Sequence, residues 1–119
     1  MPESFDRGAL TEAVYYILLS LHEPMHGYAI MQNIDSLTNG RVILGPGTLY
    51  GAINALVGKR WIKALSAERD SRKKEYVITE SGRSAFLGEL ERLGELLRNG
   101  ENARRRPGND ETARRGMGK

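Results

Sequence analysis

The sequence predicts a mainly α-helical protein with one small β-hairpin. Apolar residues recur at helical spacing in four segments of the chain. Between the third and fourth of these segments lie two short strand-like stretches, joined by charged residues as in a hairpin. The expected order is therefore helix, helix, short strand, helix, hairpin, helix.

The first two helices are predicted from apolar residues that share one face. In the first helix these are Leu10, Val14, Ile17, Leu18 and Leu21. Pro24 should end that helix, because the residue before a proline disfavours helical geometry. The second helix is expected from about Gly27 to Leu37, with a stop at Asn39–Gly40. Its inward residues should be Ile30, Ile34 and Leu37. Residues 41–47 should pass through a short extended piece into a turn.

The third helix, from about Gly47 to Lys59, has two very different faces. The buried face should hold Leu49, Ile53, Leu56 and Val57. The opposite face holds Gly47, Gly51, Asn54, Ala55 and Gly58. A glycine inside a helix costs roughly 0.5–1 kcal/mol relative to alanine, so this bare face needs an explanation outside helix stability.

The remaining elements follow the third helix directly. Residues 61–68 and 73–79 are typical of two strands, joined by the charged tip at 69–72. Thr79 is expected to cap a fourth helix from about Glu80 to Arg98, which Asn99–Gly100 should end. Residues 100–119 have almost nothing to bury and should form a disordered tail.

Positive charge is concentrated in one short segment. Residues 59–74 hold seven basic and two acidic side chains, whereas residues 1–99 as a whole are neutral. The chain's net charge of +3 therefore equals that of residues 100–119. A basic cluster on a neutral body indicates a surface for a polyanion, and the alternative is a solvated run of charges.

Composition excludes several classes of protein. The chain has no cysteine, which excludes disulfides and thiolate metal sites. Its longest apolar run, Ala13–Leu21, is far shorter than the twenty or so residues that cross a bilayer. The first residues lack the basic-then-apolar order of a signal peptide. We therefore expect a cytoplasmic protein without a membrane partner.

No set of residues with catalytic spacing is present. His22 and His26 flank Pro24, so they are not a helical pair, and no third ligand is nearby. Residues 40–45 have the glycine spacing of a phosphate-binding loop, but Pro46–Gly47 replace the lysine and hydroxyl residue that such a loop needs. We expect no enzyme, no metal and no cofactor.

Two connected helices, a helix with a bare outer face and a basic hairpin together form the arrangement of a winged helix-turn-helix. The segments HGYAI, GPGTLY and YVITESG, at residues 26–30, 45–50 and 76–82, resemble the PadR family of bacterial transcriptional regulators. The resemblance extends over roughly residues 10–82. It implies a dimeric winged-helix repressor, often responsive to a small molecule, whose C-terminal helix serves dimerisation.

We accordingly divide the chain into a winged helix-turn-helix DNA-binding domain at 1–79, a dimerisation helix at 80–99 and a disordered basic tail at 100–119. Two positions depart from the family pattern. Arg60 stands where the family usually has glycine after the third helix. Glu75 stands where a second aromatic or a basic residue is common.

The bare face of the third helix is interpreted as a surface that enters the DNA major groove, which is about 12 Å wide and just admits a helix. Gly47 would let the backbone lie deep in the groove, and Asn54 points outward and can pair with adenine. Thr48 and Tyr50, on the two flanks, can contact a phosphate or a thymine methyl group. For Tyr50 the alternative is half-burial beside Leu49.

Further contacts are expected outside this helix. Tyr28 matches the tyrosine of the family's HGY segment and can place its hydroxyl on a phosphate; the alternative is a core tyrosine with an exposed hydroxyl. The hairpin contributes Arg69, Arg72, Lys73 and Lys74. Arginine can enter a minor groove and lysine can neutralise phosphate.

The fourth helix has a continuous apolar seam. Its members are Phe86, Leu90, Leu93 and Leu97. A seam this long on the last helix favours a homodimer, and intramolecular packing is the alternative. The predicted function is that of a repressor that binds an inverted-repeat operator in double-stranded DNA, with a small-molecule effector. A protein-interaction module with a winged-helix fold, or an RNA-binding protein, is the competing hypothesis.

Overall fold

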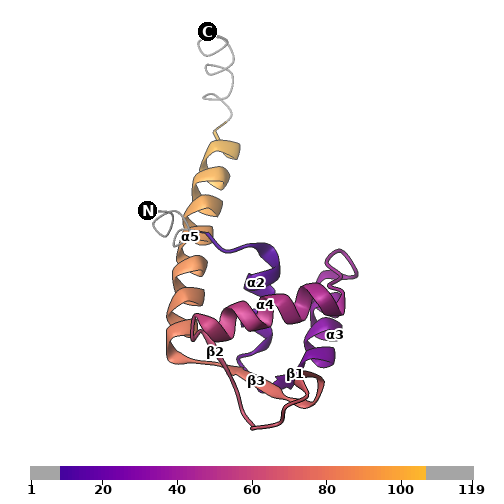
Figure 1. Ribbon diagram of the computed structural model, residues 1–119. Helices are drawn as coiled ribbons and strands as arrows, with labels where there is room; N and C mark the ends of the chain where they lie inside the picture. The colour runs from indigo at the N-terminus through magenta and orange to yellow at the C-terminus, as the bar shows by residue number, and fades with distance from the viewer. Residues whose placement is uncertain (1–8, 107–119) are drawn as a thin grey trace.

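The computed structural model describes residues 9–106, which form four α-helices and one three-stranded antiparallel sheet (Figure 1). In chain order the elements are α2 (Glu12–Ser20), β1 (Met25–His26), α3 (Gly27–Thr38), α4 (Pro46–Gly58), β2 (Ile62–Ala64), a 3-10 turn (Ser71–Lys73), β3 (Glu75–Ile78) and α5 (Glu80–Arg104). The predicted fold class, mainly helical with a winged helix-turn-helix, is confirmed.

The first helices begin and end as their sequences dictate. The hydroxyl of Thr11 accepts a hydrogen bond from the backbone N–H of Val14, at 3.1 Å, and so caps α2. Asn39, with φ of 52°, and Gly40, with φ of 79°, end α3 in left-handed conformations. Pro46 occupies the first turn of α4, where its missing N–H costs nothing.

The sheet differs from the prediction in its third strand. Strand β3 lies in the middle, with β2 on one side and the two residues of β1 on the other. Residues 41–45, predicted to hold a short strand, form bends and irregular backbone instead. A strand needs a partner edge, and the free edge of β3 is taken by Met25 opposite Tyr76.

The core lies where α2, α3 and α4 meet the sheet. Its fully buried side chains are Ile17, Leu18, Leu21, Ile30, Ile34, Leu49, Ile53 and Ile62. Two residues predicted to face inward do not: Leu37 is 52% exposed at the end of α3, and Val57 is 39% exposed at the end of α4. Each lies in the last turn of its helix; Leu56, beside Val57, is almost fully buried, so Val57 lies on the exposed side of that turn.

Helix α5 is longer than predicted. It passes through Asn99–Gly100 without a break and continues to Arg104, so residues 100–104 are helical rather than part of a disordered tail. Glu101 pairs with Arg104 and with Arg105, three and four residues further on, which supports the extra turn. The remainder of the predicted tail, from residue 107, lies outside the described residues.

Candidate nucleic-acid interface

The outer face of α4 is open and nearly without side-chain bulk. An added Cβ at Gly47, Gly51 or Gly58 would meet no atom within 4 Å. Thr48 and Asn54 are exposed on the same helix. Packing among the described residues therefore does not require these glycines, and the face is free to approach another surface closely.

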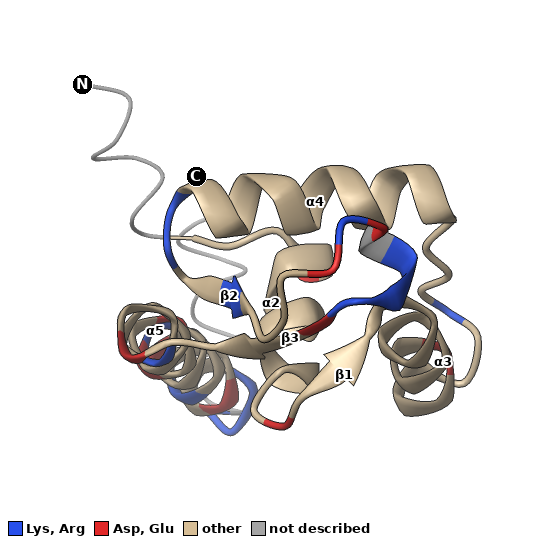
Figure 2. Cartoon of the chain, turned by 60° about the horizontal axis from the view of Figure 1, so that its bottom comes forward, with Lys and Arg blue, Asp and Glu red and all other residues tan. Residues whose placement is uncertain are grey.

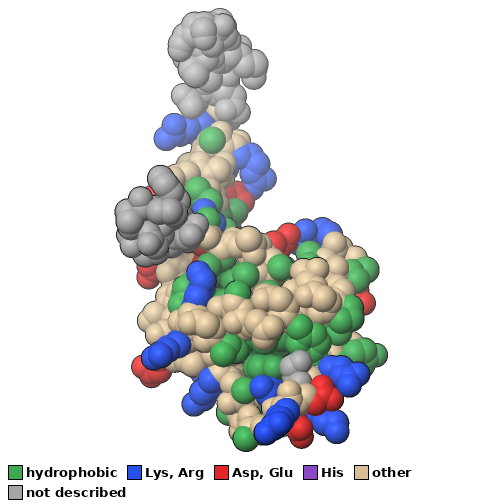
Figure 3. Space-filling model, in the orientation of Figure 1, with side chains coloured by type: hydrophobic (Ala, Val, Ile, Leu, Met, Phe, Trp, Pro, Cys, Tyr) green, Lys and Arg blue, Asp and Glu red, His purple; other side chains and the backbone are tan. Residues whose placement is uncertain are grey.

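The opposite face of α4 holds the helix rigidly. Leu49 and Ile53 are fully buried, and Leu56 is almost so. In the space-filling view the outer face appears as a tan band across the front of the molecule, with hydrophobic side chains along its edges (Figure 3). The sequence thus places a fixed, flat helix surface on the outside of the domain.

Tyr50 is more deeply packed than a surface contact residue. An added Cβ at Gly27 would lie 2.3 Å from the Tyr50 hydroxyl oxygen, so the ring rests directly on the start of α3. Tyr50 is half-buried, as the alternative interpretation expected. Its ring reaches from α4 to the start of α3, and a contact of its hydroxyl with DNA stays a prediction.

Tyr28 lies at the first turn of α3 and is 66% exposed, so the core alternative for this residue is wrong. Its hydroxyl accepts a hydrogen bond from Nε2 of Gln32 at 3.3 Å. No side chain caps the N-terminus of α3. The exposed phenol is therefore available to an anion, whereas Gly27, the first residue of α3, is buried.

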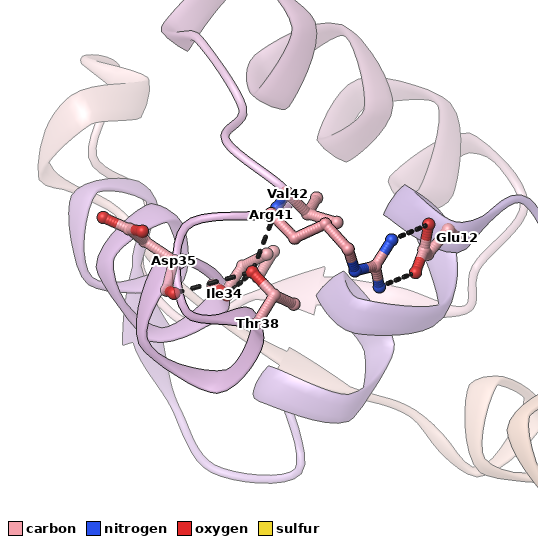
Figure 4. Close-up of polar contacts among 6 residues, drawn as sticks. All are labelled: Glu12, Ile34, Asp35, Thr38, Arg41 and Val42. Carbon is pink, nitrogen blue, oxygen red and sulfur yellow. Dashed lines mark hydrogen bonds and ion pairs between the residues drawn. The ribbon is translucent and has the colours of Figure 1, made fainter.

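The turn before α4 is anchored by a cluster that the sequence did not reveal (Figure 4). Nη1 and Nη2 of the Arg41 guanidinium donate to the two carboxylate oxygens of Glu12 at the start of α2. The hydroxyl of Thr38 donates to the carbonyl of Ile34 at 2.9 Å and accepts from the N–H of Val42 at 3.0 Å. These bonds fix the path of the chain into α4. The hydrogen-bonded Arg41 lowers the pKa of Glu12, which keeps the pair charged.

The wing, defined here as residues 65–74, places its basic side chains in water. Arg69, Arg72 and Lys73 are exposed, and Lys74 is half-buried. Figure 2 shows this basic stretch on the loop beside α4. Arg72 is held by Asp70, whose carboxylate accepts from the Arg72 backbone N–H at 3.0 Å and from its guanidinium at 3.2 and 3.1 Å.

This pairing shifts the pKa of both of its members. Hydrogen bonds from the side chain and backbone of Arg72 lower the pKa of Asp70. The same carboxylate raises the pKa of Arg72. Both shifts favour the charged forms, and a phosphate that approaches Arg72 meets a guanidinium already oriented by Asp70.

The seam of α5 divides between two surroundings. Phe86, predicted to lie at a dimer interface, is buried in the core instead, where its ring stacks on Tyr15 with centroids 4.9 Å apart. The later seam residues Leu90, Leu93 and Leu97 are exposed, as are the flanking Leu87 and Leu96. Leu87 and Leu90 lie in the first half of α5, on a side that the domain does not cover, and the second half of the helix extends beyond the body of the domain (Figure 1).

A partly buried ion pair forms within the first half of α5. Glu89 is nearly fully buried, and its carboxylate accepts from Arg92 at 2.9 and 2.7 Å. The hydrogen bonds from Arg92, with a smaller contribution from the backbone N–H of Leu10, lower the pKa of Glu89 although burial opposes them. Sequence spacing did not single out this pair.

Two further features bear on the class of protein. Residues 9–106 contain no group of three or more side chains placed to hold a metal ion. Within that range no helix has the length and apolar character needed to span a membrane.

A helix-turn-helix whose second helix, α4, is followed by a β2–β3 hairpin defines a winged helix-turn-helix protein. The model of the PadR-like family of transcriptional regulators matches residues 16–87, more than half of the chain, and the chain therefore belongs to that family. The family and the solved neighbours below are transcriptional regulators, a class that is generally not enzymatic.

Solved structures agree with this assignment. A transcriptional regulator from Clostridium thermocellum is 26% identical, with a TM-score of 0.62 over 84% of this chain and 96% of that one. A PadR-like transcription factor from Bacteroides fragilis is 30% identical, with a TM-score of 0.59 over 86% of this chain and 95% of that one.

An uncharacterized 37.1 kDa protein in transposon Tn4556 of Streptomyces fradiae is 34% identical over 86 residues, which are 71% of this chain and 24% of that protein. The chain thus spans about a quarter of the length of that relative.

Proposed function

We propose that this chain is a sequence-specific repressor that binds double-stranded DNA as a homodimer. The observation that supports the proposal most strongly is the open outer face of α4, where an added Cβ at Gly47, Gly51 or Gly58 meets nothing within 4 Å. A helix with such a face fits deep in a major groove, and Asn54 at its centre is exposed and able to pair with adenine.

The wing and α3 supply the contacts that hold the DNA backbone. Arg69, Arg72 and Lys73 are exposed cations beside α4, suited to phosphate or to a minor groove. The exposed hydroxyl of Tyr28 provides a hydrogen-bond donor on a second element, α3. In this arrangement α4 supplies sequence recognition, and the other elements supply position and affinity.

The homodimer is supported by α5, whose leucines continue past the body of the domain. Leu90, Leu93 and Leu97 leave a stripe in water that a second copy of the helix would cover. Two copies related by a twofold axis would present their α4 helices to successive major grooves, about 34–36 Å apart, on an inverted-repeat operator. A small-molecule inducer that releases the operator completes the proposal and rests on the family resemblance alone.

The test is a fluorescence titration at constant salt. The probes are a labelled duplex from the DNA upstream of the protein's own gene, a random duplex of equal length and an RNA duplex. A repressor should bind the upstream duplex roughly 10³-fold or more tightly than the random one. Equal affinity for the two DNA duplexes, or preference for the RNA, would contradict the proposal.

The alternative is a protein-interaction module whose basic wing docks on an acidic partner. The exposed cations of the wing are compatible with it. It predicts weak binding to every duplex. The same titration therefore separates the two functions.

A further inference from the structure

Arg60 has a backbone conformation that its side chain disfavours. Its φ of 66° lies in the left-handed region, which a residue with a Cβ enters at a cost in free energy. The other such residue among those described with a side chain is Asn39, a type that tolerates the conformation. Arginine, unlike asparagine, is not a residue type that favours the left-handed conformation.

The conformation itself is required by the end of α4. The N–H of Trp61 donates to the carbonyl of Leu56 at 3.1 Å, and the N–H of Arg60 donates to that of Val57 at 3.0 Å. These two bonds form the helix ending that most often has glycine at the left-handed position. The carbonyl of Arg60 also accepts from the hydroxyl of Thr79 at 2.6 Å. A glycine at position 60 would preserve all of these backbone bonds and remove the strain.

The side chain of Arg60 gains nothing within residues 9–106 that offsets this strain. It is exposed, and no described residue forms an ion pair or a side-chain hydrogen bond with it. Lys59 beside it lies over the ring of Trp61, with its ammonium nitrogen 4.8 Å from the ring centroid. Lys63 on β2 is exposed as well. Lys59, Arg60 and Lys63 are here called the junction cluster.

The position of the junction cluster suggests a ligand. Lys59 and Arg60 lie in the connection between α4 and β2, and Lys63 lies on β2; Figure 2 shows blue at both places, at the end of α4 opposite to the loop that enters that helix. The 13 residues of α4 span about 20 Å. A recognition helix contacts base edges chiefly with its N-terminal part, so the C-terminal end of α4 would lie beside the sugar–phosphate backbone at the edge of the groove.

We propose that the junction cluster is a phosphate-binding site for the DNA backbone, with Arg60 as its principal contact. It is separate from the wing and acts at the far end of α4. Because it binds the same DNA, it rests on the proposed function. A guanidinium that meets a phosphate oxygen explains why an exposed, unpaired arginine occupies a place where glycine would be less strained.

The experiment compares Arg60→Gly with Arg60→Lys in the full chain. The probes are the upstream duplex and the random duplex, titrated at several salt concentrations. Arg60→Gly should weaken binding to both duplexes roughly three- to tenfold and reduce the salt slope by about one unit. Arg60→Lys keeps the charge and the strained backbone, so it should retain the slope. The matched control Arg98→Ala removes one exposed charge from the second half of α5 and should change neither affinity nor slope.

Thermal unfolding of the same variants separates a folding effect from a binding effect. Arg60→Gly should unfold at the same temperature as the wild type or higher, so weaker binding cannot be due to a less stable fold. Undiminished affinity and an unchanged slope for Arg60→Gly, with specific binding by the wild type, would overturn the inference and leave the proposed function standing. Failure of the wild type to prefer the upstream duplex would instead count against the proposed function.

Discussion

Helices α4 and α5 each expose one face to solvent, and the two faces differ in the bulk and polarity of their side chains. The outer face of α4 carries glycines, Asn54 and Ala55, with open space above the glycines. The second half of α5 carries a stripe of exposed leucines, among them Leu93 and Leu97. Both helices are anchored to the same core by their other side or their other end.

The difference indicates what each face would contact. A face without bulk gains little from burying apolar area, so its value lies in letting the backbone and a few polar groups approach a grooved surface. A leucine stripe gains by removing apolar area from water, at about 25 cal/mol per Å², which favours a like surface over a polar one. One domain thus offers one face suited to a nucleic acid and another suited to a second copy of itself.

The largest expected effect comes from placing a charge in the leucine stripe. Leu93→Asp would bury a carboxylate in an apolar interface, at a cost of several kcal/mol to dimerisation. Leu93 is 38% exposed in the single chain, so the fold itself should tolerate the change. Sedimentation should show monomer for this variant and dimer for the wild type.

The matched control for this variant is Leu65→Asp, which changes an exposed leucine of the wing instead of α5. It should sediment like the wild type. A Leu93→Asp protein that remains dimeric would show that the stripe does not form the interface.

A smaller effect is expected at the Glu89–Arg92 ion pair within α5. Glu89→Gln keeps the shape but removes the charge that Arg92 stabilises, and should cost about 1–2 kcal/mol of unfolding free energy at pH 7. The folded-state pKa of Glu89 is lowered, so this contribution is present above the ordinary carboxyl pKa near 4.5 and is lost as the pH falls through the lowered value.

The measurement is chemical denaturation of wild type and Glu89→Gln from pH 7 down to pH 3. The stability difference between them should be constant above about pH 5.5 and shrink below the ordinary carboxyl pKa near 4.5. A difference that grows on acidification would mean that burial, rather than Arg92, dominates at Glu89.

The smallest effect on the free energy of unfolding is expected at the bare outer face of α4. There a substitution should stabilise the fold rather than destabilise it. Gly51→Ala adds a methyl group in open space and should stabilise the protein by about 0.5–1 kcal/mol. In the proposed complex the same methyl group would hold α4 away from the groove, so operator affinity should fall.

Gly88→Ala is the control for this variant, because Gly88 lies inside α5 with equally open space around it. It should give the stabilisation without the loss of affinity. Equal DNA binding by Gly51→Ala and Gly88→Ala would mean that the bare face of α4 does not enter a groove.

Local signals predicted much of this fold. The stop at Asn39–Gly40 and the cap at Thr79 depend on a few neighbouring residues, and both are confirmed. The inward residues of α4 were predicted as far as Leu56, because the helical period holds wherever a neighbour covers the helix. The strand at Met25–His26 was missed, since two residues carry no periodicity and this strand exists only by pairing with β3.

Contacts between distant segments account for the remaining misses at the candidate site. Phe86 belongs to the same seam as Leu90, and only the packing of α5 against α2 decides that Phe86 enters the core. Glu12 and Arg41 are 29 residues apart, a separation at which no spacing rule applies. The basic wing was predicted as a cluster, but not that Asp70 would hold Arg72.

The most direct test of the account is the ratio of operator to random-DNA affinity for two variants. Asn54→Ala removes the polar group at the centre of the bare face and should cost roughly 1–3 kcal/mol on the operator and little on random DNA, so the ratio falls. Arg72→Ala removes the proposed contact with the DNA phosphate backbone and should weaken both complexes alike, with a salt slope lower by about one unit. The ratio of operator to random-DNA affinity should therefore stay unchanged. If Asn54→Ala leaves the ratio unchanged while Arg72→Ala abolishes it, the wing recognises the sequence and the role assigned to α4 is wrong.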